Sequence, residues 1–181
     1  GNRVNLRKVV ERTGIPITQP QTQQKMLAAI AGGAPDEKLR TISALAELAT
    51  VWSNDQAPQQ TKDAAKKLLE AVDDARGDEI PAVRGWAMYR AAMIRSSEQR
   101  KVGAAQMLTD SNWPIRALGV MAAGSLSKDD AAATLESAKS DQEPIIALLA
   151  KSTVEVAKHA TTQPSTAPSN QPTSQPGDPL P

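Results

Sequence analysis

The side chains that most often do chemistry are scarce in this sequence. It holds one histidine, His159, and no cysteine. Without cysteine there is no thiolate nucleophile, thiolate metal site or disulfide, and one histidine does not build a zinc site alone. His159 stands at the end of the last expected helix, where the helix dipole favours a cation. The sequence therefore points away from nucleophilic and zinc chemistry.

Carboxylates gather in two places, within residues 73–79 and at Asp129-Asp130. The pair follows Ser127 at an expected helix start, where acids are favoured. The first group lacks the alternating ligand spacing of an EF-hand loop and is interpreted as a solvated loop. No GxSxG, Walker A or GxGxxG motif occurs. We therefore predict no metal site, no cofactor and no enzyme activity.

Arginines and aromatic side chains in the middle third are the candidates for binding. Trp86 and Tyr89 are three residues apart on one helix face, with Arg90 beside Tyr89 and Arg84 two residues before Trp86. Such side chains serve protein and nucleic-acid partners alike, although Trp86 also suits a core position and Tyr89 the core edge. We predict that these four residues bind another protein or peptide. The net charge of +1 disfavours nucleic acid.

The elements that must position these residues are predicted to be helices. Hydrophobic residues make up 40% of the chain, yet Phe is absent, which favours packed helices over a β-sandwich. No run approaches the 18 apolar residues of a membrane span. Residues 21–159 follow a helical period throughout. In the last helix we expect the stripe Ile145, Leu148, Leu149, Ser152 and Val156 to face the core.

A pattern recurs at the start of the longer helices. Each start combines a proline, an aliphatic residue and, in most cases, an arginine, with an acid a few residues earlier that can hold the loop. The residues predicted to form this structural repeat are Pro81, Val83, Arg84, Asp110, Pro114, Ile115, Arg116 and Pro144. The interval is 30 to 45 residues with two helices per unit, which is typical of an α-solenoid.

This pattern resembles the HEAT repeat, particularly its short bacterial form, over about residues 21–158. The closest segment is "DSNWPIRALGVMAAG", followed by "DEIPAVRGWAMYRAA". The resemblance implies an all-α solenoid of about four antiparallel helix pairs. It also implies that Arg84 and Arg116, and less directly Arg40, bond a loop aspartate of a neighbouring unit. In the fourth unit Ile145 takes the aliphatic position and Ile146 replaces the arginine.

The two ends differ in composition from the repeats. Residues 1–20 are interpreted as an extension and linker. Residues 160–181 are rich in Thr, Gln, Ser and Pro and are predicted to be a disordered tail. This tail, with a first residue, Gly1, that is not Met, favours an exported protein of the bacterial cell envelope. The alternative location is the cytoplasm.

The sequence predicts a non-enzymatic adaptor that binds a protein on the concave face of the solenoid. Two alternatives stay open. One is a protein similar to the bilin lyases, some of which carry short HEAT-like repeats, acting on a tetrapyrrole carrier; the missing cysteine and the few aromatics weigh against it. The other is a nucleic-acid-binding module that uses the central bases.

Overall fold

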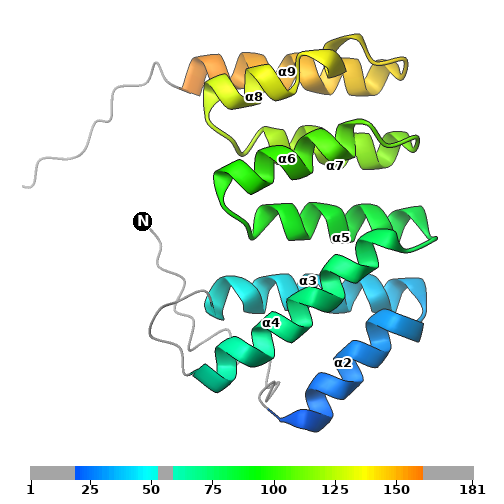
Figure 1. Ribbon diagram of the computed structural model, residues 1–181. Coiled ribbons are helices and arrows are strands. Elements are labelled where there is room, and N and C mark those ends of the chain that lie inside the picture. Colours follow the sequence, from blue (N-terminus) through cyan, green and yellow to red (C-terminus); the bar gives the residue numbers. More distant parts are fainter. Residues whose placement is uncertain (1–18, 53–58, 161–181) are drawn as a thin grey trace, which may run out of the picture.

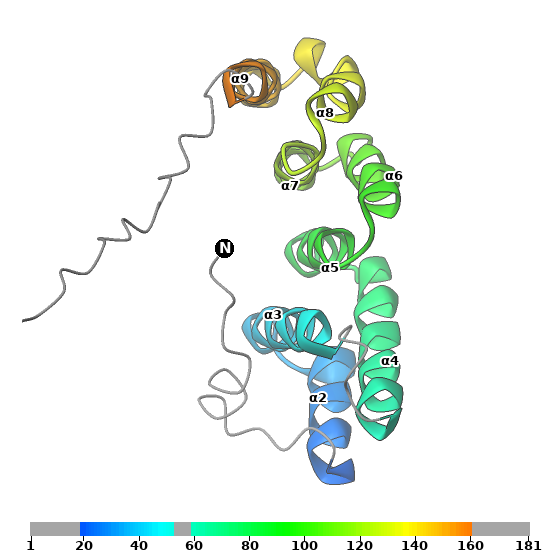
Figure 2. The same cartoon turned by 90° about the vertical axis from the view of Figure 1, so that its left-hand side faces the viewer.

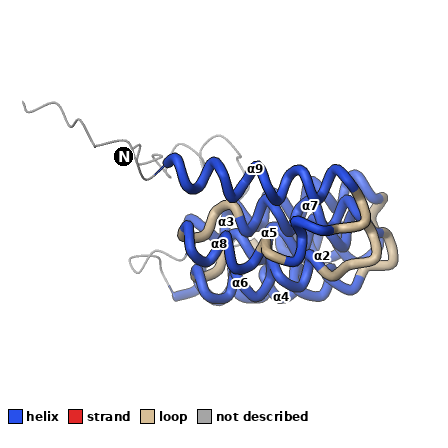
Figure 3. The backbone as a smooth tube through the Cα atoms, turned by 90° about the horizontal axis from the view of Figure 1, so that it is seen from above, coloured by secondary structure: helices blue, strands red, loops and turns tan. Residues whose placement is uncertain are grey.

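All regular elements in the described part of the chain are helical. The computed structural model describes residues 19–52 and 59–160, and Figure 3 shows only helices and loops there. The elements are α2 (Pro20–Gly32), α3 (Pro35–Trp52), α4 (Gln59–Asp74), η1 (Ala75–Gly77), α5 (Pro81–Met93), α6 (Ser97–Leu108), α7 (Trp113–Ala123), α8 (Lys128–Thr134), η2 (Ser137–Ser140) and α9 (Pro144–Ala160). The all-α prediction is confirmed.

Two predicted features lie outside this description. Residues 1–18 hold most of the predicted N-terminal extension, and residues 161–181 hold the predicted tail. Among the described helices, none has both the length and the hydropathy that crossing a bilayer requires.

The helices form two layers. Figure 2 shows α3, α5, α7 and α9 on one side, here called the first layer, and α2, α4, α6 and α8 on the other, the second layer. Within the first layer α5 packs between α3 and α7, and α7 packs against α9. The first-layer helices all run in the same direction (Figure 1). Their amino ends, and the loops before them, therefore line one edge of the molecule.

Local sequence explains where these helices begin. Pro81 and Pro144 each occupy the first helical position, and Pro114 the second; proline loses no helical hydrogen bond there. In the second layer, Ser96 and Ser127 cap α6 and α8, since their hydroxyls accept the backbone N–H three residues later. The cap residues and prolines thus set the boundaries that the sequence pattern indicated.

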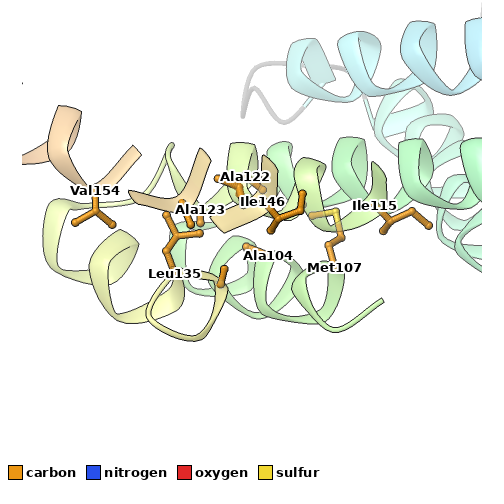
Figure 4. Packing of buried hydrophobic residues seen from close by; sticks show 12 residues of the cluster. Ala104, Met107, Ile115, Ala122, Ala123, Leu135, Ile146 and Val154 are labelled. Carbon is orange, nitrogen blue, oxygen red and sulfur yellow. The ribbon is translucent and has the colours of Figure 1, made fainter. Parts of the chain in front are cut away.

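Buried aliphatic side chains hold the layers together in two clusters, one over α2–α5 and one over α5–α9. Figure 4 shows the second of these clusters. Val83, Ile115 and Ile146 each stand at the third residue of their helix and are at most 2% exposed. Ile145 is 47% exposed, so the predicted register of the fourth unit is wrong by one residue. Counting from the helix start, Ala147 occupies the arginine position.

The predicted core face of α9 is also wrong. Ile145, Leu148, Leu149 and Val156 are exposed, while Ile146, Ala150 and Val154 are buried. Both sets follow helical spacing, so α9 has two apolar faces. It packs on α7, α8 and η2 and lies at the end of the first layer (Figure 2). Among the residues that the structure describes, only one of these two faces is therefore covered.

Glycine permits a close contact between α6 and α7. A Cβ on Gly119 would lie 3.0 Å from the backbone nitrogen of Leu108 and 3.0 Å from Cβ of Met107. Helices α6 and α7 therefore touch through backbone at this point.

Candidate functional site

A row of ion pairs runs along the loop edge of the first layer. Three bases each reach an aspartate in the loop before the next first-layer helix. The pairs are Lys38 Nζ to Asp78 Oδ2 at 2.6 Å, Arg84 Nε to Asp110 Oδ2 at 3.6 Å, and Arg116 Nε to Asp141 Oδ2 at 2.8 Å with Nη2 to Oδ1 at 2.9 Å. We call this row the base–acid ladder.

The ladder follows a fixed register. Each base is the fourth residue of its helix, and each acid stands three residues before the first residue of its helix. At the first helix the acid position is Gly32, and at the last the base position is Ala147. The ladder thus begins with a base and ends with an acid, and every member within it has a partner.

Arg40 does not take part in the ladder. Its guanidinium pairs with Asp36 one turn earlier on the same helix, and both side chains are more than 70% exposed. Lys38 stands at the ladder position instead, three residues after Pro35, as Arg84 does after Pro81. The prediction for Arg40 is therefore wrong by two residues.

Each ladder aspartate has a second bond that fixes its loop. One carboxylate oxygen accepts the backbone N–H two residues later, at 2.8 to 2.9 Å, just before the helix begins. The carboxylate thus joins a base of one unit to the helix start of the next. Arg116 extends this link, because its Nη1 donates to the carbonyl oxygen of Asp110 at 2.9 Å.

These bonds lower the pKa of all three aspartates. Hydrogen bonds from Lys38 and the backbone N–H of Ile80 lower the pKa of Asp78. The hydrogen bond from Arg116 likewise lowers the pKa of Asp141. Burial raises the pKa of Asp110, but hydrogen bonds from Asn112 and the charge of Arg84 outweigh it, and the net direction is downward.

The lowered pKa values predict acid destabilisation. A carboxyl whose pKa is lower in the folded protein binds protons more readily in the unfolded chain. Its contribution to the free energy of unfolding is therefore complete above the ordinary aspartate pKa of about 3.9, and it is lost as the pH falls through the pKa of the folded state. We expect the free energy of unfolding to hold from about pH 7 to about pH 5 and to fall below about pH 4. Urea unfolding at several pH values measures this, and Asp141→Asn should flatten the fall. The pKa of Asp130, which pairs with Lys101, is also lowered. An unchanged slope in Asp141→Asn would contradict the assignment.

A shallow groove crosses α3, α5 and α7 beside the ladder. Its volume is about 740 Å³. Its lining is mostly apolar, with one base and one acid, and we call it the Trp86 groove. It is lined by Leu39, Arg40, Ser43, Ala44, Glu47, Ala82, Trp86, Pro114 and Leu118.

Trp86 is held firmly in this groove. Its Nε1 donates to Ser43 Oγ at 2.8 Å, and that hydroxyl donates to the carbonyl oxygen of Leu39 at 2.9 Å. On α5 the indole stacks on Tyr89, with ring centres 5.6 Å apart. The guanidinium of Arg90 lies 5.7 Å from the indole ring. An aromatic side chain fixed in this way loses little entropy on binding.

Arg90 connects the same cluster to α3. Its Nη2 donates to the carbonyl oxygen of Ser43 at 3.2 Å and lies 3.6 Å from a carboxylate oxygen of Glu47. Its Nε is buried and has no hydrogen-bond partner in the described part of the chain. The guanidinium thus spans two helices and helps to hold the groove wall.

The four residues predicted to bind a partner divide into two groups. Trp86, Tyr89 and Arg90 come together, with only Trp86 on the groove lining, and Tyr89 and Arg90 packed behind it. Arg84 is engaged in the ladder and its side chain is 23% exposed. The sequence did not single out Ser43 or Glu47, since each lies about 43 residues from the α5 side chain it contacts.

The arrangement of the groove can serve recognition. Within residues 19–52 and 59–160, no three His, Cys, Asp or Glu side chains come together as metal ligands. The groove offers an apolar centre with Arg40 and Glu47 at its border. Such a surface can receive an apolar side chain with a charged residue of either sign beside it.

Comparison with known proteins adds no family to this description. The sequence matches no protein-family model, and no curated protein is significantly similar to it.

Proposed function

We propose that the protein is a non-enzymatic adaptor that binds another protein or a peptide in the Trp86 groove. The groove itself carries this proposal, because it combines open apolar surface with an aromatic side chain already fixed in place. Tryptophan in such settings dominates binding energy. The partner segment would present an apolar anchor to Trp86 and Leu118 and opposite charges to Arg40 and Glu47.

We further propose that the two layers are a short α-solenoid of the HEAT type. Two features support this reading: a helix pair recurs along the stack, and the base–acid ladder joins each unit to the next at the same register. Solenoids use extended faces of this kind to bind other proteins.

Nucleic-acid binding is the weaker candidate. Arg84, Arg95 and Arg116 are all paired with aspartates, so these central bases are largely neutralised. A phosphate backbone needs a row of unpaired cations. The residues that line the groove add no argument for a protein that handles tetrapyrroles.

A blocking substitution tests the proposal. Ala44 lines the groove on α3, and Ala44→Arg would place a long cation in it without removing any core side chain. We expect the dissociation constant for a captured partner to rise by at least about tenfold. The partner is first captured from native lysate by the full chain, and its affinity is then measured for each variant by calorimetry.

The matched control is Ala133→Arg, which makes the same change at an exposed position of α8. Both variants are first checked by circular dichroism. Equal affinity for the parent, Ala44→Arg and Ala133→Arg would refute the groove as the binding site. Capture of nucleic acid with strongly salt-dependent affinity would favour the alternative function.

The place of the protein in the cell is a separate proposal. The composition of residues 160–181 supports the bacterial cell envelope, and cell fractionation tests it. Recovery in the cytoplasmic fraction alone would contradict it.

A further inference from the structure

A small hollow lies between η1, α5 and α6 and shares no lining residue with the Trp86 groove. Its volume is about 230 Å³, smaller than the sites of about 300–1,000 Å³ that hold drug-sized ligands. Two arginines and two glutamines form its polar lining, and the rest of the lining is apolar. We call it the Arg95 hollow, and it is lined by Arg76, Met88, Ala91, Ala92, Arg95, Gln99, Val102, Gly103 and Gln106.

Two guanidiniums of this hollow share one carboxylate. Nη2 of Arg95 donates to both carboxylate oxygens of Asp73, at 2.6 Å to Oδ1, and Nη1 of Arg76 lies 3.4 Å from the same Oδ1. Two bases and one acid leave a net positive charge. Lys66 and Glu70, which border the neighbouring hollow beside Arg95, offset each other. The pairing of Arg95 with its aspartate therefore does not neutralise this site.

The hollow presents hydrogen-bond donors. Nη2 of Arg76 donates to Oε1 of Gln106 at 2.7 Å, and the hydroxyl of Ser96 donates to Oε1 of Gln99 at 3.4 Å. Because both amide oxygens already accept a bond, the amide nitrogens of the two glutamines remain as donors. Nε and Nη1 of Arg95 donate to no group in the described part of the chain. A ligand suited to this hollow therefore supplies acceptors.

We propose that the Arg95 hollow binds a small organic carboxylate with a short aliphatic chain. The carboxylate lies between the guanidiniums of Arg76 and Arg95, since the planar guanidinium fork matches its two oxygens. The aliphatic chain covers Met88 and Val102, of which Val102 is 65% exposed. The apolar lining favours such an acid over an inorganic anion, which has no apolar part to bury.

Titration of hexanoate into the isotope-labelled full chain, followed by nuclear magnetic resonance, measures this binding. We expect saturable shifts at the lining residues of α5 and α6 and a dissociation constant in the millimolar range, as for a ligand of few atoms. Hexan-1-ol keeps the chain without the charge, and inorganic phosphate keeps a charge without the chain. Each is expected to bind at least about tenfold more weakly than hexanoate.

Two substitutions in the same network are expected to act in opposite directions. Arg76→Gln removes one of the two cations and should raise the dissociation constant for hexanoate by at least about tenfold. Asp73→Asn removes the carboxylate that competes for both guanidiniums and should lower the same constant by about threefold or more. A network that serves folding alone predicts the same direction for both variants, because each change breaks the same ion pair.

The matched control is Lys139→Gln on η2. The side chain of Lys139 is 29% exposed and pairs with Glu136 three residues earlier, as that of Arg76 is 28% exposed and pairs with Asp73 three residues earlier. Both substitutions to glutamine remove one positive charge from such a pair. Lys139→Gln should leave the dissociation constant unchanged, and circular dichroism first shows that every variant is folded.

Four outcomes overturn the proposal. They are the lack of saturation by hexanoate up to about 0.1 M, equal affinity for hexanoate and phosphate, an equal loss in Lys139→Gln, and changes of the same sign in Arg76→Gln and Asp73→Asn. None of them bears on peptide binding in the Trp86 groove, so the adaptor proposal and the carboxylate site fail independently.

Discussion

Replacing Ile146 with alanine is expected to lower the free energy of unfolding by about 2–4 kcal/mol. Ile146 is fully buried in the α5–α9 cluster, so its removal loses apolar burial and leaves a cavity. Its neighbour Ile145 is 47% exposed, and Ile145→Ala should cost less than about 1 kcal/mol. Urea unfolding followed by circular dichroism measures both.

This pair of variants decides the register of the last unit. The two residues have the same side chain and adjoin in sequence, so composition and helix propensity are matched. A larger loss for Ile145→Ala than for Ile146→Ala would restore the register expected from sequence and contradict the structure.

Removal of the Arg116 side chain is expected to lower the free energy of unfolding by about 1–3 kcal/mol. The side chains of Arg116 and Asp141 are only 15% and 11% exposed, and two bonds join them. Arg116→Ala leaves the Asp141 carboxylate with its backbone N–H bond but without a counter-charge. An unpaired charge in a mostly buried position costs far more than a solvated one.

The exposed pair on α3 provides the control. Arg40→Ala removes a guanidinium that is 77% exposed and should change stability by no more than about 0.5 kcal/mol. A double-mutant cycle that combines Arg116→Ala with Asp141→Ala should give a coupling energy of about 1–2 kcal/mol. Losses at Arg116 and Arg40 that agree within error would show that the ladder contributes nothing to stability.

Helix content and helix starts were predictable because their causes are local. A proline at the first turn, a serine cap and an apolar 3–4 spacing act within one or two turns of the chain. The aspartates were also predictable as loop anchors, since Asp78 and Asp110 stand at the same distance before their helices.

The register errors came from choosing by residue type instead of by distance from the helix start. Arg40 was chosen over Lys38 because it is an arginine, yet only Lys38 lies three residues after the first helical proline. Asp141 lies three residues before Pro144, and this spacing alone would have placed Ile146 in the core. Counting residues from the expected helix start in every unit was the available signal.

The two apolar faces of α9 and the groove depended on information that no single helix contains. Periodicity shows that a face is apolar but not whether another helix covers it. Trp86 and Ser43 meet only because α5 packs beside α3. Such contacts follow from the stacking of units, which local sequence does not specify.

The ladder also bears on how a chain of this kind changes length during evolution. Each base finds its acid in the following unit, so a cut made at the same point of two successive units removes whole pairs. Excision of residues 79–110 would delete Arg84 and Asp110, which are each other's partners, and leave Lys38 with Asp78 and Arg116 with Asp141. Duplication of the same segment adds one complete pair. Gain or loss of a unit therefore leaves no ladder charge without a partner, and this edge of the molecule places no electrostatic penalty on changes in the number of repeats.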